Sequence, residues 1–166
     1  MILSARLFEY DELKNKLKKD ENIIVFSCNN CAKKCDGLGG RVGLKALCDK
    51  LDTDGFNVTR RELCGIACSL DMIQERARNE ATAQIFKDAD VIIPLSCEDG
   101  EHAIHHIFPH VRIVRVTKTI GIGWASPKEG VRLTDVLHGV PVKVPGPQGI
   151  TLKEAADQLN LPVGAF

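Results

Sequence analysis

The fold is decided by one stretch of the sequence, Asn22-Ile-Ile-Val-Phe-Ser-Cys28-Asn-Asn-Cys31-Ala-Lys-Lys-Cys35-Asp-Gly-Leu-Gly-Gly40. The four consecutive apolar residues at its start predict a strand over residues 22–27 that is buried on both faces, as in a parallel sheet. Three cysteines and a glycine-rich segment follow this strand directly. They therefore fall at its carboxyl end, where open α/β folds bind their ligands.

Strands and helices alternate along the chain on both sides of this stretch. The apolar runs predict further strands over residues 56–62, 90–96 and 111–116, and helical spacing predicts helices over residues 39–52, 70–87 and 100–108. Right-handed βαβ crossovers put the carboxyl ends of all such strands on one edge. The sequence therefore predicts a Rossmann-like α/β fold, with a parallel sheet of about four strands flanked by helices.

The two ends of the chain have a different pattern. Residues 5–19 have helical spacing, and residues 121–127 are rich in glycine and typical of a loop. Proline-flanked residues 140–144 indicate an edge strand, and Thr151 with Glu154 forms a capping box that begins a helix. We expect residues 124–166 to form an irregular C-terminal extension, whose apolar end docks on the core or on a partner.

The composition suits one domain spanning residues 1–166. Apolar residues make up 44% of the chain, and 22 basic residues balance 22 acidic ones, which gives no reason to expect a nucleic-acid partner. No apolar stretch approaches the roughly 18 residues of a membrane span, and no secretion signal is apparent, so we expect a cytoplasmic protein. In that compartment, cysteines are thiols or metal ligands.

The functional prediction rests on the spacing of the cysteines. The C-x2-C-x3-C pattern of Cys28, Cys31 and Cys35 can bring three thiolates to one centre, as a 4Fe–4S cluster requires. Cys64 and Cys97 each follow another predicted strand, and either could supply the fourth ligand. A zinc ion could use the same sulfurs, but structural zinc sites usually pair two compact knuckles, so we favour a cluster.

Other candidate residues have simpler interpretations. We expect Cys48 to pack in the core and Cys68 to pack more readily than to ligate, and we expect a run of histidines near residue 105 to lie on the surface. A segment with Gly37, Gly39 and Gly40 precedes a helix and could cradle a phosphate. We favour another role, in which these glycines let the backbone approach the cluster and donate N–H groups to its sulfurs.

The cysteine segment also resembles a known family. With its C-x2-C-A-x2-C-D-G-L-G-G order, it is similar to the C-x2-C-A-x2-C-x-T-G-G segment in the small iron–sulfur subunit of bacterial methylenetetrahydrofolate reductases. That module is also known as the methylenetetrahydrofolate reductase C-terminal-type domain. Further similarity lies at the A-D…C-x-D-G pattern of residues 89–100 and at residues 114–121. The resemblance covers residues 22–123.

The resemblance implies one 4Fe–4S cluster held by Cys28, Cys31 and Cys35, with Cys64 or Cys97 completing it. It further implies an electron-transfer or accessory subunit of an anaerobic one-carbon oxidoreductase complex, with a larger partner subunit such as a flavoprotein. The family's later cysteine-rich region is missing, since no cysteine follows Cys97, so a second cluster is not expected. The alternatives are a structural-zinc assembly protein and a small independent enzyme with an open metal or cluster position.

Overall fold

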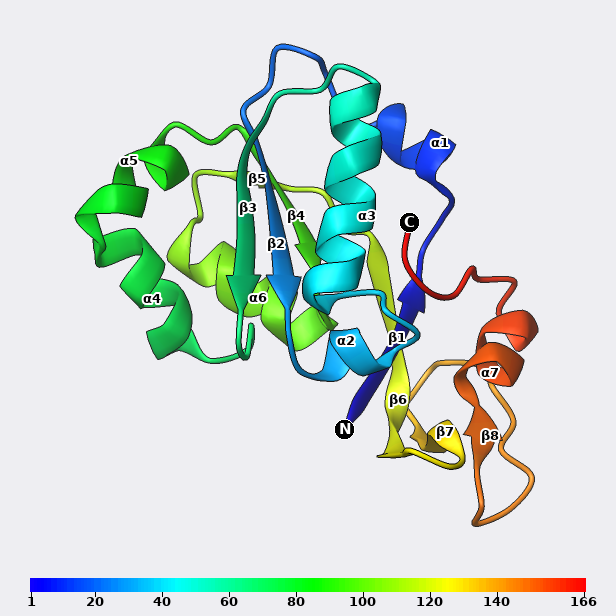
Figure 1. The fold of residues 1–166 in the computed structure, drawn as a ribbon. Helices are drawn as coiled ribbons and strands as arrows, with labels where there is room; N and C mark the ends of the chain where they lie inside the picture. Colours follow the sequence, from blue (N-terminus) through cyan, green and yellow to red (C-terminus); the bar gives the residue numbers. More distant parts are fainter.

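A parallel sheet forms the centre of the protein in the computed structural model, which describes all residues 1–166 (Figure 1). Its strands are β2 (Ile23–Cys28), β3 (Val58–Cys64), β4 (Val91–Leu95) and β5 (Arg112–Ile113), in the order β3-β2-β4-β5. Every adjacent pair is parallel. The predicted Rossmann-like α/β class is confirmed.

Helices cover both faces of this sheet, which explains why its central strands are continuously apolar. Ile23 and Val25 of β2 pack in a cluster with α3 (Gly40–Thr53) on one face. Ile24 and Phe26 point the other way. They pack with residues of α4 (Leu70–Arg78), α5 (Glu80–Lys87) and α6 (Glu98–Ile107) on the opposite face (Figure 1). The strands β2, β3 and β4 each end at or within two residues of a cysteine.

A second, antiparallel sheet lies beside the first. It consists of β1 (Ile2–Arg6), β6 (Thr117–Ser126), β7 (Gly130–Val136) and β8 (Ile150–Thr151), in the order β1-β6-β7-β8, and α7 (Leu152–Gln158) packs on it. The first and last parts of the chain thus come together in one layer (Figure 1). Residues 124–166 were expected to be irregular, but they contribute the end of β6, the strands β7 and β8, and the helix α7.

The loop prediction for residues 121–127 is wrong. These residues lie mostly in β6, and their glycines allow β7 to approach closely, because a Cβ at Gly121 or Gly123 would collide with backbone carbonyls of Asp135 or Arg132. The N-terminal helix expected over residues 5–19 is replaced by β1 and the short α1 (Tyr10–Lys14). Pairing with a strand more than 100 residues away overrides the local helical spacing.

Other boundaries differ less from prediction. The helix expected over residues 70–87 is broken into α4 and α5 at Asn79, whose side chain accepts a hydrogen bond from the Ala81 amide at 2.9 Å and begins a new helix. Residues 140–144 form no strand. The Thr151–Glu154 capping box is present, and the chain end packs on the core through Phe166, which is 7% exposed.

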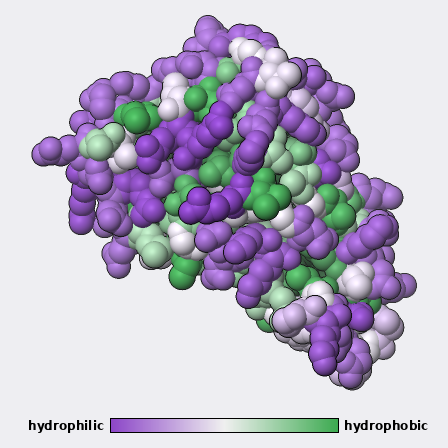
Figure 2. Space-filling view, in the orientation of Figure 1, coloured by the Kyte–Doolittle hydropathy of each residue, from purple (hydrophilic) through white to green (hydrophobic).

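The protein surface is mainly hydrophilic on the face shown in Figure 2, with apolar residues visible in separate patches. None of the helices combines the length and the hydropathy that crossing a bilayer requires.

The close approach of β7 to β6 predicts that Gly123→Ala destabilises the protein. We expect the free energy of unfolding, measured by urea titration, to fall by about 1–3 kcal/mol, because the added Cβ meets the Arg132 carbonyl. Gly146→Ala is the matched control, since no atom lies within 4 Å of its Cβ position. Equal stability of the two variants would contradict the packing described for this sheet.

Candidate metal centre

Three loops at the carboxyl edge of the parallel sheet carry six of the seven cysteines. Cys28 ends β2 and begins the loop to α2 (Cys31–Lys34) and α3, while Cys64 ends β3 and begins the loop to α4. Cys28 and Cys64 are partners in the parallel register. Cys97 lies two residues beyond β4 and is the N-cap of α6. Because β3, β2 and β4 are neighbours, the three loops lie side by side (Figure 1).

The thiols from different loops are close enough to affect each other's ionisation. Burial raises the pKa of Cys97 to about 11, and the nearby Asp99, Cys68 and Cys28 raise it further, whereas the Gly100 amide opposes the shift. Cys28 and Cys97 lie on adjacent strand ends, and Cys68 comes from the third loop. All three loops thus place a sulfur in one region.

Cys35 extends this group from the far end of α2. Its side chain is fully buried, and its sulfur accepts a hydrogen bond from the Ser4 amide at 3.4 Å and donates one to the Cys31 carbonyl at 3.3 Å. Burial raises the pKa of Cys35 to about 12. Cys31 and Cys97 raise it further, and the Ser4 amide partly offsets the rise. The Cys35 sulfur therefore contacts both the second sheet, through Ser4 of β1, and the cysteine loop, through Cys31.

The loop after β3 adds Cys64 and Cys68. Burial raises the pKa of Cys64, the Arg76 guanidinium lowers it, and Cys28 raises it again, while the Cys64 thiol donates to the Ile66 carbonyl at 3.5 Å. Cys68 is exposed, and its pKa is raised first by partial burial of the sulfur and then by Cys28. We expected Cys68 to pack in the core, but its side chain is exposed and lies near Cys28.

Cys48 and the histidines lie outside this group. Cys48 is fully buried in the cluster between α3 and the sheet, as predicted, and burial raises its pKa to about 12 with no other thiol contributing. The four histidines His102, His105, His106 and His110 are exposed, which confirms their predicted surface position.

The glycine segment packs against the cysteine loop. A Cβ at Gly39 would lie 2.8 Å from the Cys28 carbonyl oxygen and 2.9 Å from the Leu95 carbonyl oxygen, so only glycine allows this approach. Gly37 and Gly40 have φ angles of 76° and 69°, in the left-handed region. The first three amides of α3 donate to no other group of the protein. The glycine backbone therefore lies close to the cysteine loop, and its predicted hydrogen bonds to cluster sulfurs stay a prediction.

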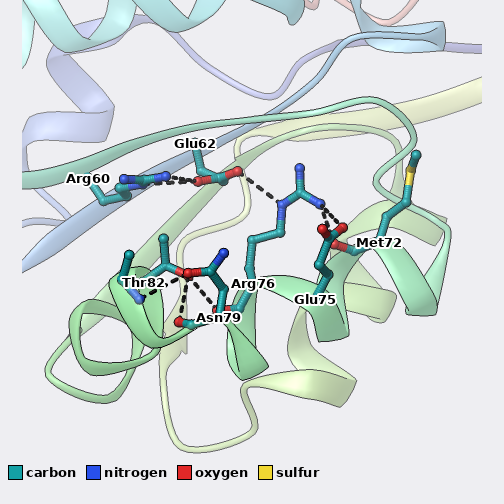
Figure 3. Close-up of polar contacts among 8 residues, drawn as sticks. Arg60, Glu62, Met72, Glu75, Arg76, Asn79 and Thr82 are labelled. Atoms are coloured by element: carbon teal, nitrogen blue, oxygen red, sulfur yellow. Dashed lines mark hydrogen bonds and ion pairs between the residues drawn. The ribbon is translucent and has the colours of Figure 1, made fainter.

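A buried ion-pair network anchors the loop that carries Cys64 and Cys68 (Figure 3). The Glu62 carboxylate is 5% exposed, and it accepts hydrogen bonds from Arg60 at 2.8 and 3.0 Å and from Arg76 of α4 at 3.1 Å. The network borders a cavity of about 220 Å³ lined by two arginines, two glutamates, Asn79 and Thr82. The charges of the two arginines and the two glutamates that line the cavity cancel. The hydrogen bond from Arg76 to Glu62 attaches α4 to the edge strand β3. Sequence inspection did not reveal this network.

The donor set suits a thiolate-bound metal centre. No group of three or more His, Cys, Asp or Glu side chains is arranged around a single ion position. A cubane cluster does not require its ligands to surround a single ion, because its four thiolates bind four different iron atoms. Cys28, Cys31, Cys35 and Cys97 supply four sulfurs from two adjacent loops. The number and the chemistry of these thiols suit a cluster, and the cluster itself stays a prediction.

Comparisons of this chain with protein-family models, with curated proteins and with solved structures each gave no match.

Thiol burial predicts an order of alkylation in the metal-free, reduced protein. At pH 8, we expect iodoacetamide to modify exposed Cys68 at least about a hundredfold faster than Cys35. The pKa of Cys35 is about 12 against an ordinary 9.0, which lowers its thiolate fraction about a thousandfold. Peptide mass spectrometry over time measures both rates. If Cys35 reacts as fast as Cys68, the burial of Cys35 against the second sheet is wrong.

Proposed function

We propose that this protein binds one 4Fe–4S cluster at the carboxyl edge of its parallel sheet and acts as an electron-transfer or accessory subunit of a larger oxidoreductase. One observation carries the proposal: three separate loops bring six thiols to this edge. In a reducing compartment, such a concentration of thiols is typical of a metal centre and not of a disulfide framework.

Cys28, Cys31, Cys35 and Cys97 are the ligands that we propose. The first three form the compact C-x2-C-x3-C pattern. Cys97 completes the set, because it lies near both Cys28 and Cys35, which are at opposite ends of that pattern. Cys64 is the weaker candidate, since Cys28 is the one thiol that shifts its pKa.

The surrounding chain supports a cluster in two ways. A bound cluster would supply one-electron transfer, with a potential set by burial and by hydrogen bonds to its sulfurs. Cys35 and Cys97 are 0% and 6% exposed, so the protein keeps water from their sulfurs. The free amides at the start of α3 and the Ser4 amide are donors next to the cysteine loop.

A larger partner is part of the proposal. Ile66, Leu70 and Met72 are exposed by 40%, 43% and 37%, and all three lie in the segment that carries Cys68. An apolar surface beside a redox centre supports contact with another protein. The one-carbon, methylenetetrahydrofolate reductase-like setting and a flavoprotein partner rest on the resemblance of the cysteine motif alone.

Structural zinc is the second candidate, because four thiolates are also one of its usual ligand sets. Metal analysis of anaerobically purified protein separates the two. We expect about four irons and four sulfides per chain, with a broad visible absorbance that dithionite bleaches. One zinc and no sulfide would refute the electron-transfer proposal.

Replacing single cysteines tests the ligand set. We expect Cys31→Ala and Cys97→Ala each to retain less than about a tenth of the wild-type iron, because each removes one of four cluster ligands. The measurement is iron and sulfide content per folded chain after anaerobic purification.

Cys48→Ala is the control for these variants, since Cys48 is buried in the core away from the other thiols. We expect it to keep the wild-type iron content. Full occupancy in Cys31→Ala, or loss of iron in Cys48→Ala, would contradict the assignment.

A further inference from the structure

The second sheet contacts the proposed centre through Ser4 of β1. The Ser4 amide donates to the Cys35 sulfur at 3.4 Å, and the Ser4 hydroxyl lies 3.4 Å from the hydroxyl of Thr119 on β6. Both residues are buried, at 1% and 4% exposure. They are partners in the antiparallel register, next to a register shift between Leu3 and Ser4. Such irregularities often redirect groups beside functional sites.

Thr119 links Ser4 to the chain segment that carries Cys97. Its hydroxyl oxygen accepts a hydrogen bond from the Glu98 amide at 3.0 Å, in the first turn of α6. Glu98 directly follows Cys97, the N-cap residue, whose own side chain makes no capping hydrogen bond. Thr119 therefore satisfies one amide that the helix start leaves free.

These contacts form a continuous path from Cys35 through Ser4 and Thr119 to the backbone beside Cys97. The two thiols come from different loops of the parallel sheet, and the path runs through a different sheet. Buried hydroxyls require partners, so this arrangement fixes the distance between the two loops. Outer hydrogen bonds of this kind orient metal ligands.

We propose that Ser4 and Thr119 are positioning residues that hold the Cys35 and Cys97 loops together for a shared metal centre. The inference rests on the proposed function in taking both thiols as ligands. The antiparallel sheet is then part of the centre, because its β1–β6 pairing sets the ligand geometry.

Thiol reactivity in the metal-free protein tests the positioning directly. We expect Thr119→Val to raise the alkylation rate of Cys97 about tenfold relative to that of Cys48 in the same chain, because the Glu98 amide loses its acceptor and the start of α6 opens more often. Thr119→Ser should restore the wild-type ratio. A general loss of stability would raise the rates of Cys97 and Cys48 together and leave their ratio unchanged.

Thr82→Val is the matched control, because Thr82 is also buried and donates its hydroxyl to the Arg76 carbonyl at 2.7 Å, away from this path. We expect it to leave the ratio unchanged. Ser4→Ala keeps the amide and loses only the hydroxyl contact, so it should move the ratio less than Thr119→Val in the same direction. If Thr119→Val does not fold, Ser4→Ala provides the same test of the alkylation ratio.

The iron-loaded protein gives the second measurement. We expect Thr119→Val to lose iron to a chelator about tenfold faster than wild type and Thr82→Val to lose it at the wild-type rate. An unchanged alkylation ratio and unchanged iron loss would overturn the positioning role while leaving the cluster assignment intact. A changed ratio in a protein that binds no iron would refute the cluster and retain the positioning role.

Discussion

The parallel pairing of β2 with β3 and β4 is the constraint on which the centre depends. It places Cys28 opposite Cys64 in the register and brings Cys97 to the next strand end. The pairing is stable because alternate residues of β2 fill two separate hydrophobic clusters, one under each layer of helices. A one-residue slip of β2 would exchange these faces and move the thiols away from each other. The core and the candidate site are therefore determined by the same register.

The second sheet contacts the cysteine loop through Ser4 of β1. Cys35 belongs to a hydrophobic cluster formed with β1, β6 and α7, although its sulfur lies near those of the parallel sheet. The buried Cys35 side chain is kept from water, whereas Cys68 in the loop after β3 is exposed. In the proposed electron-transfer role, this difference would protect the cluster near Cys35 and let a partner approach near Cys68. The exposed apolar residues near Cys68 agree with that arrangement.

The parallel sheet and most of its thiols could be predicted from the sequence because their signals are local. A continuous apolar run predicts a buried strand, and a cysteine directly after it falls at the strand's end. The strand β6 could not be predicted in this way. Its glycines resemble those of a loop, and their role as contact points for β7 depends on a strand ten residues later. Cys68 was predicted to pack for a similar reason, because its spacing from Cys64 does not indicate which loop its side chain faces. The Arg60–Glu62–Arg76 network combines residues of a strand and a helix, and its pairing emerges only from the tertiary fold.

The most direct test of this account is the location of iron in crystals grown without oxygen, determined by anomalous diffraction at the iron absorption edge. The account predicts one peak between the loops that follow β2 and β4, within bonding distance of the sulfurs of Cys28, Cys31, Cys35 and Cys97. Ordered, unbound thiols at these positions, or iron only at the exposed histidines of α6, would contradict it.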